Sequence, residues 1–195
     1  DIVALYAGAM GAKQGLDLVL DAAKALLEEP KFKFVLVGGG PEWRRLCTDA
    51  GERGLTNIQF VPLQPIEKLP EMLAAADVHL VVQKAEAADI VMPSKLTNIL
   101  ASGRAAIATA NQGTALSDAI EQSGAGFVIP PEDTPALVGA LKELAGAPEL
   151  AAKMGKKARA FAEATLDLDV IMRAFEKELL TIAASATERR RWILP

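Results

Sequence analysis

The chain has 195 residues, a formal net charge of −4 and a hydrophobic fraction of 51%. This length suits one domain with a substantial core, the negative charge gives no reason to expect nucleic-acid binding, and no apolar run approaches the ~20 residues that span a bilayer. One cysteine and one histidine exclude an internal disulfide and argue against a Cys/His zinc site, as in a protein of the reducing cytoplasm. No signal-peptide pattern opens the chain. Because it lacks an initiator methionine and begins directly with a strand, we expect a piece of a longer protein.

Apolar runs of strand length alternate with helical patterns. The strand-type runs lie at residues 2–6, 32–37, 58–61, 78–82, 105–108 and 126–130. Helical spacing of apolar residues lies at 16–27, after Pro41, and at 66–75, 94–102, 114–122, 134–144, 149–162 and 168–184. Strands that are apolar on both faces and alternate with helices predict an α/β fold, a doubly wound, Rossmann-like parallel sheet of about six strands with a helical C-terminal segment. We expect one domain over 1–184 and a solvated tail over 185–195, with a membrane or partner contact of its arginines as the minor alternative.

One proline-led helix start is the strongest candidate site. Pro93 and Ser94 precede a short apolar helix, and Ser94 is a good N-cap type. The N–H groups and the dipole at a helix start favour an anion. Lys95 would add positive charge, and Asn98, three residues on, would either bond a ribose hydroxyl or be a surface residue. Gly103 is the predicted stop signal of this helix. We predict that the start of the helix binds the diphosphate of a sugar nucleotide.

Two glycine-rich connections follow the first two strands. After Gly38–Gly40, the third glycine of a dinucleotide fingerprint would have to stand at Trp43, so NAD binding is disfavoured. This loop is either a tight strand-to-helix turn or part of a nucleotide pocket. The loop at 8–15 lacks the ending of a P-loop. Its Lys13 would either neutralise a phosphate or be an ordinary solvated lysine.

The sequence offers no catalytic group. His79 lies inside an apolar strand, which is typical of a satisfied core histidine. Glu86 and Asp89 form an acidic pair that no other feature supports, and no nucleophile–base pair or metal-ligand cluster is visible. We therefore name no catalytic residue, no metal and no cofactor, and expect this chain to supply binding.

Six ordered segments carry a family resemblance. They are YAGAMGAKQGLDLVLDAA, FVLVGGGPE, GLTNIQFVPL, LPEMLAAADVHLV, MPSKLTNILASGRAAIAT and SGAGFVIPPED. Together, over residues 2–164, they resemble family 4 of the retaining glycosyltransferases, and more narrowly the bacterial exopolysaccharide enzymes of colanic acid biosynthesis. The resemblance implies the C-terminal, donor-binding half of a GT-B fold, with the N-terminal acceptor domain absent from this chain.

The resemblance also implies which residues meet the donor. Those placed against the diphosphate are Gly8, Lys13, Pro93, Ser94, Lys95 and Leu96. Gly38 is placed against the nucleotide, the backbone of Val61, Pro62 and Leu63 against the base, and Asn98 against the ribose.

The chain departs from the family pattern at two places. The family lysine before the first helix is Gln14 here, with Lys13 one position earlier. The paired family glutamates fall on Ile90 and Asn98, which should weaken ribose binding and removes a carboxylate near the transferred sugar.

By this resemblance the full-length protein is a glycosyltransferase. It would transfer a sugar from a UDP- or GDP-linked donor to a polysaccharide or lipid-linked oligosaccharide, retaining and metal-independent, in the cytoplasm or at the inner face of the membrane. The chain alone is expected to be inactive because its acceptor half is missing. A sugar-nucleotide 2-epimerase and a non-catalytic nucleotide-binding module remain alternatives. A receiver domain would need an acidic cluster that the sequence lacks.

Overall fold

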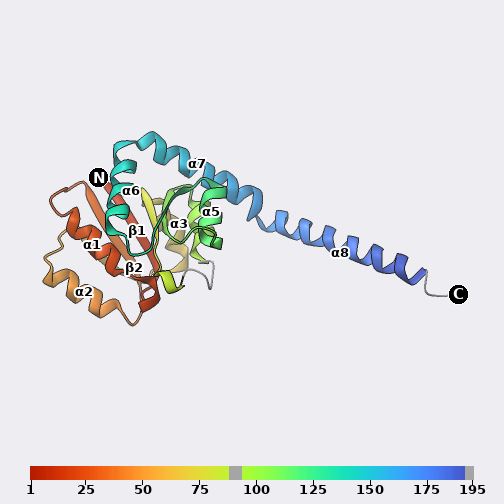
Figure 1. Ribbon diagram of the computed structural model, residues 1–195, viewed down its shortest axis with the longest axis horizontal. Coiled ribbons are helices and arrows are strands. Elements are labelled where there is room, and N and C mark those ends of the chain that lie inside the picture. Colours follow the sequence, from red (N-terminus) through yellow and green to blue (C-terminus); the bar gives the residue numbers. More distant parts are fainter. Residues whose placement is uncertain (88–93, 192–195) are drawn as a thin grey trace.

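The computed structural model describes residues 1–87 and 94–191 (Figure 1). Six parallel strands form one sheet in the order β3-β2-β1-β4-β5-β6. The strands are β1 (Ile2–Ala9), β2 (Phe32–Gly39), β3 (Ile58–Pro62), β4 (Val78–Val81), β5 (Ala105–Thr109) and β6 (Gly126–Ile129). The predicted doubly wound, Rossmann-like parallel sheet is confirmed.

Helices cover both faces of the sheet. The α-helices are α1 (Asp17–Ala25), α2 (Trp43–Glu52), α3 (Leu69–Ala74), α4 (Lys95–Ser102), α5 (Ala115–Ser123), α6 (Thr134–Gly146), α7 (Pro148–Thr165) and α8 (Leu168–Arg191). Short 3₁₀ turns are η1 (Ala12–Gln14), η2 (Ile66–Lys68) and η3 (Ala85–Ala87). Within the described residues, none of these helices combines the length and the apolar character that crossing a membrane requires.

The core is divided by the sheet into two layers. On one face, α1, α2 and α6 pack on the strands. Trp43 at the start of α2 meets Phe60 of β3 edge to face, with 5.8 Å between the ring centroids. On the other face, α4, α5 and the C-terminal half of α7 pack on β4 and β5. Because strands in the middle of the sheet are covered on both faces, they are buried throughout and mostly apolar, as in β4 and β5.

Two predicted helices differ from the structure. The helix expected at 66–75 is divided into η2 and α3, because Pro70 has no N–H to donate to the carbonyl of Ile66. Helix α8 ends at Arg191 instead of about Ala184, so the arginines at 189–191 continue a helix. No glycine or proline interrupts residues 185–191.

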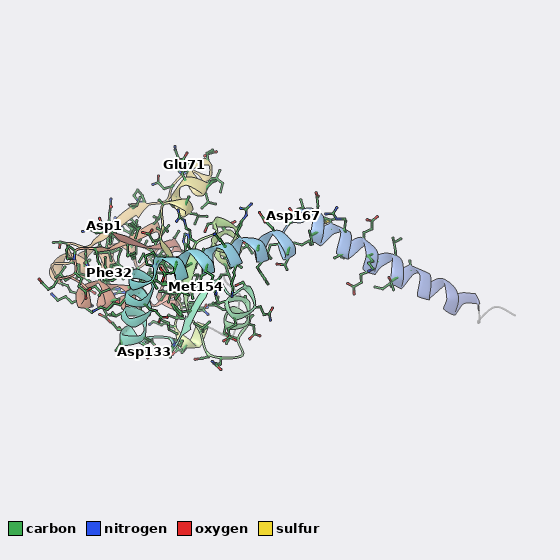
Figure 2. The ribbon with its side chains drawn as sticks, turned by 90° about the horizontal axis from the view of Figure 1, so that it is seen from above. Asp1, Phe32, Glu71, Asp133, Met154 and Asp167 are labelled. Atoms are coloured by element: carbon green, nitrogen blue, oxygen red, sulfur yellow. The ribbon has the colours of Figure 1, made fainter. Side chains whose placement is uncertain are left out.

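Helix α8 projects away from the body of the molecule (Figure 1), and on the view from above its described side chains, which lie beyond Asp167 and end at residue 183, point into open space (Figure 2). Large apolar side chains on α8 are therefore exposed: Leu168, Ile171, Met172, Phe175, Leu179, Leu180 and Ile182.

Candidate functional site

The strand order creates a switch point between β1 and β4. From β1 the chain proceeds to β2 and β3 on one side, and from β4 it proceeds to β5 and β6 on the other. In open parallel sheets, ligands bind beyond the carboxyl ends of the strands at such a point. Three of the predicted site residues lie in one row at this edge, since Gly8 of β1 pairs with Gly38 of β2, and Gly38 pairs with Pro62 of β3.

The first two loops at this edge are joined through their backbones. The N–H of Met10 donates to the carbonyl of Gly39 (2.8 Å), and the carbonyl of Met10 accepts from the N–H of Glu42 (3.0 Å). A Cβ on Gly38 would lie 2.0 Å from the carbonyl oxygen of Gly8, and its φ of +143° favours glycine. The glycine run thus permits a close turn, one of the two explanations above. Contact of Gly38 with a nucleotide stays a prediction.

Within the first loop, Gln14 has a structural task. Its side-chain oxygen accepts from the N–H of Gly11 (3.0 Å), which closes the 3₁₀ turn η1. The side chain of Lys13 is exposed, while its carbonyl accepts from the N–H of Lys84 (2.9 Å). The residue that replaces the family lysine therefore shapes the loop, and a contact between Lys13 and a phosphate stays a prediction.

The start of α4 differs from expectation in its cap. Ser94 is exposed, has helical dihedral angles (φ −56°, ψ −26°), and its side chain caps no N–H. The predicted side-chain cap is wrong, because a capping hydroxyl needs an extended backbone to reach back to the first turn. The N–H groups of that turn are consequently not taken by Ser94. The predicted stop is confirmed, since Gly103 ends α4 in the left-handed conformation. Pro93, with Asp89 and Ile90, lies outside the described residues.

Three other predicted residues are placed as follows. Leu96 is fully buried in the core layer between α4, α5, α7 and the sheet, so only its backbone could meet a ligand. Asn98 is exposed on α4. Leu63 follows the end of β3 and is 80% exposed. Their contacts with a nucleotide stay predictions.

Lys95 connects α4 to the end of β1. Its Nζ lies 3.9 Å from the centroid of the Tyr6 ring, and a Cβ placed on Gly8 would be 3.8 Å from the same Nζ. Lys95 as a residue is partly exposed, but burial of its ammonium lowers the pKa to about 7. Within the described part of the chain no carboxylate forms an ion pair with it. Two predicted residues, Gly8 and Lys95, are thus brought together.

Sequence reasoning missed two residues at this edge. Tyr6 is fully buried, and its hydroxyl donates to the carbonyl of Ala9 (2.5 Å). Gln83 follows β4 and is 8% exposed, and both its N–H and its carbonyl bond to Oγ1 of Thr109 at 2.8 Å. The Nε2 of Gln83 is buried and has no acceptor among the described residues. The available signal was a polar or aromatic residue next to the carboxyl end of an apolar strand.

His79 is a core residue, as predicted. It is 1% exposed, and its Nε2 lies 3.1 Å from the carbonyl oxygen of Leu73. Burial lowers the pKa of its imidazole to about 4, so the ring is neutral at pH 7. Across the described residues, no three His, Cys, Asp or Glu side chains lie close enough together to hold a metal ion.

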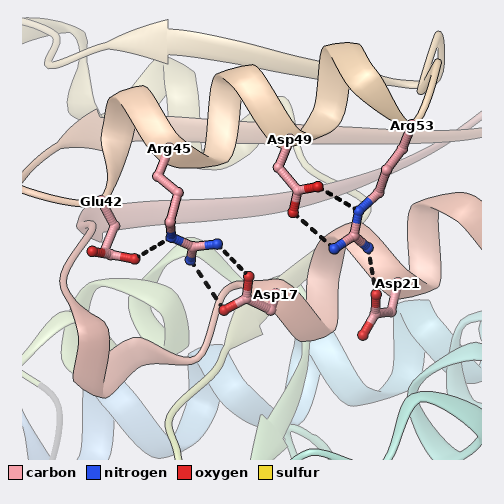
Figure 3. Close-up of polar contacts among 6 residues, drawn as sticks. All are labelled: Asp17, Asp21, Glu42, Arg45, Asp49 and Arg53. Carbon is pink, nitrogen blue, oxygen red and sulfur yellow. Dashed lines mark hydrogen bonds and ion pairs between the residues drawn. The ribbon is translucent and has the colours of Figure 1, made fainter.

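A hollow of about 310 Å³ lies beside the first loop, between α1 and α2. Arg45 lines it, but this guanidinium already bonds to Asp17 (2.8 Å) and to Glu42 (2.5 Å), as Figure 3 shows. Further along the same helices, Arg53 bonds to Asp21 and Asp49 in the same manner. The two carboxylates thus neutralise this arginine, while Lys84 also lines the hollow.

Comparison with known proteins gives the family. Residues 1–161 match the family described as glycosyl transferases group 1. The chain is 43% identical over 178 residues to the colanic acid biosynthesis glycosyl transferase WcaI of Escherichia coli, an alignment covering 91% of this chain and 42% of that protein. It is 30% identical over 189 residues to the O-antigen chain mannosyltransferase C of Escherichia coli (93% and 47%). The chain thus spans somewhat less than half the length of these relatives.

Solved structures give the fold. HepE of Anabaena in complex with UDP superposes with a TM-score of 0.81 at 17% identity, over 93% of this chain and 49% of that one. Sucrose-phosphate synthase from Thermosynechococcus elongatus superposes with a TM-score of 0.76 at 22% identity, over 95% and 46%. The predicted GT-B-type, Rossmann-like half is confirmed by these likenesses.

Proposed function

We propose that this chain, which belongs to the glycosyl transferases group 1 family, binds the nucleoside diphosphate of a sugar donor at the carboxyl edge between β1 and β4. The observation that carries the proposal is the place of Lys95, whose ammonium lies beside Gly8 at the end of β1 without a carboxylate partner among the described residues. HepE, which shares the fold, was solved in complex with UDP. Relatives named as glycosyl transferases support a sugar-linked diphosphate as the ligand.

The electrostatics of this edge favour an anion. A buried cation without a counter-charge is costly, and a bound diphosphate would supply that charge. The first-turn N–H groups of α4, which Ser94 does not cap, add the positive end of a helix dipole. The buried Nε2 of Gln83 would find its missing acceptor in an oxygen of the same ligand.

The same groups would act on the leaving group. When the bond between the sugar and the diphosphate breaks, the diphosphate gains negative charge, which the Lys95 ammonium and the α4 amides would stabilise. In oxyanion-type sites, removing one such donor typically costs about 3 kcal/mol of transition-state stabilisation.

The transfer itself belongs to the longer protein. We propose that the full-length enzyme transfers the sugar with retention of its anomeric configuration and without a metal ion, to a polysaccharide or lipid-linked oligosaccharide. The transfer of a sugar and the class of acceptor are supported by the family and by relatives named for colanic acid and O-antigen; retention and metal independence follow from the resemblance of the sequence segments given above. The acceptor contacts would lie in the half that this chain does not span.

Calorimetry of UDP, GDP and UMP with this chain tests the donor site. A diphosphate should bind more tightly than the monophosphate, and Lys95→Ala should weaken diphosphate binding at least about tenfold, the lower range for a charge-assisted hydrogen bond. Lys153→Ala, the same change at an exposed lysine of α7, is the matched control. Equal affinity of the wild-type and Lys95→Ala chains would refute the assignment.

A further inference from the structure

We propose that Tyr6 is a positioning residue of the donor site: its ring holds the ammonium of Lys95 at the carboxyl end of β1, ready for the diphosphate. The inference rests on the proposed function, because it assigns to Tyr6 a task in the same site.

The ring is a fixed platform. Tyr6 is fully buried within β1, where it pairs with Leu36 of β2, and its hydroxyl is tied to the carbonyl of Ala9 at 2.5 Å. A Cβ on Gly8 would lie 3.6 Å from that hydroxyl and 3.8 Å from the Lys95 Nζ. The phenol, the ammonium and the bare backbone of Gly8 therefore meet at one point of the edge.

The chemistry of the contact suits a cation that must later bind an anion. The face of an aromatic ring attracts a cation without supplying a negative charge that would neutralise it. A carboxylate would hold the lysine more strongly and would neutralise it. Arg45, between Asp17 and Glu42, shows the result of that alternative in the same molecule. The ring thus keeps Lys95 in place and leaves its charge for the ligand.

The contact also sets how binding should depend on pH. The Lys95 ammonium has a pKa of about 7, whereas burial raises the pKa of the Tyr6 phenol above its usual range, so the ring stays neutral. Two charged groups on the helices packed against α4 are engaged elsewhere: Arg159 of α7 donates to the carbonyl of Ala101, and Glu71 of α3 pairs with Lys68.

A bound diphosphate favours the protonated lysine, so binding above pH 7 takes up a proton and weakens as the pH rises. The phosphate itself, whose last pKa is about 6, is already ionised over this range. Without the ring, the ammonium would move into solvent and its pKa would rise toward the ordinary value of about 10.4. The affinity for the diphosphate would then no longer change between pH 7 and pH 9.

The test measures UDP and GDP binding at pH 7 and pH 9 for wild type, Tyr6→Phe and Tyr6→Leu, each with Lys95 and with Lys95→Met. With Lys95, the Phe variant should bind within about twofold of wild type and keep its pH dependence, whereas the Leu variant should bind about tenfold more weakly with a flat profile. In the Lys95→Met background, the two Tyr6 variants should bind alike, since a positioning residue acts only through its partner.

A second measurement does not depend on the Leu variant folding. In the NMR spectrum of the free wild-type chain, the ε-methylene protons of Lys95, assigned with Lys95→Arg, should be shifted upfield by the ring. Ordinary shifts there, or a Leu variant that binds and titrates like wild type, would overturn the role of Tyr6. If the wild-type chain binds no nucleoside diphosphate, the proposed donor site is wrong, while the NMR result still decides whether the ring of Tyr6 holds Lys95.

Discussion

On the surface between α1 and α2, Arg45 and Arg53 each lie between two carboxylates, whereas at the edge between β1 and β4 Lys95 lies against an aromatic ring. The arginine pairs are exposed or partly exposed, and Arg45–Asp17 and Arg53–Asp21 join two helices (Figure 3). The lysine ammonium is buried and joins a helix to the end of a strand. A cation that is already paired contributes to holding the fold, and a cation without a counter-charge is available to a ligand.

The two regions also differ in how their segments are joined. Side-chain ion pairs connect α1 to α2, but the loops after β1 and β2 are joined by backbone hydrogen bonds across glycines. Solvent screens the ion pairs, so each pair contributes little to stability. Where two backbones are in van der Waals contact, there is no room for an added side-chain atom.

The largest effect is expected from Gly38→Ala. Its Cβ would lie 2.0 Å from the Gly8 carbonyl oxygen at a φ of +143°, so β1 and β2 would have to separate. Overpacking and backbone strain together should lower the free energy of unfolding by about 3 kcal/mol or more. Denaturant unfolding measures this, with Gly39→Ala as the matched control, since a Cβ there meets nothing within 4 Å. Equal losses in the two variants would show that the close approach is not required.

A smaller effect, confined to binding, is expected from Gln83→Leu. Leucine has a similar volume and removes a buried donor that lacks an acceptor among the described residues, so the melting temperature should stay the same or rise. Diphosphate binding should weaken about fivefold, the value of one neutral hydrogen bond. Calorimetry with UMP, UDP and UDP-glucose tells whether the lost contact is to the phosphates or to the sugar. Gln122→Leu, at an exposed position on α5, is the control, and unchanged affinity for all three ligands would remove Gln83 from the site.

The smallest effect is expected from Arg45→Met on the paired surface. Breaking exposed ion pairs should lower the free energy of unfolding by about 1 kcal/mol or less, without changing diphosphate binding. Arg45 holds the pKa of the Asp17 carboxyl below its usual value, chiefly by hydrogen bonding.

The contribution of a carboxyl with a lowered pKa is present above its unfolded pKa of about 3.9, and it is lost as the pH falls through the folded value. Denaturant unfolding of both proteins at pH 7 and at pH 3 should therefore show a difference that shrinks in acid. A difference that grows in acid would contradict the role given to this pair, and Arg44→Met, at the exposed neighbour, serves as the control.

Much of this architecture could be predicted from local patterns. The six strands and most helices follow from apolar periodicity, and the end of α4 follows from Gly103, because these depend on the neighbours along the chain. His79 could be assigned to the core for the same reason. The α3 region was less predictable, since Pro70 divides it, and the Ser94 cap failed because it depends on a backbone angle that residue type does not determine.

By itself, then, the sequence determined the alternation of strands and helices, a doubly wound parallel sheet of Rossmann type, and Lys95 as a candidate cation. The tertiary structure decided that Lys95 lies on Tyr6 beside Gly8, that Arg45 is already paired, and that Gln83 has a buried donor to spare. Periodicity reports which side of a segment is buried. Which two side chains meet across 89 residues of chain depends on how strands and helices pack, and that packing is a property of the whole fold.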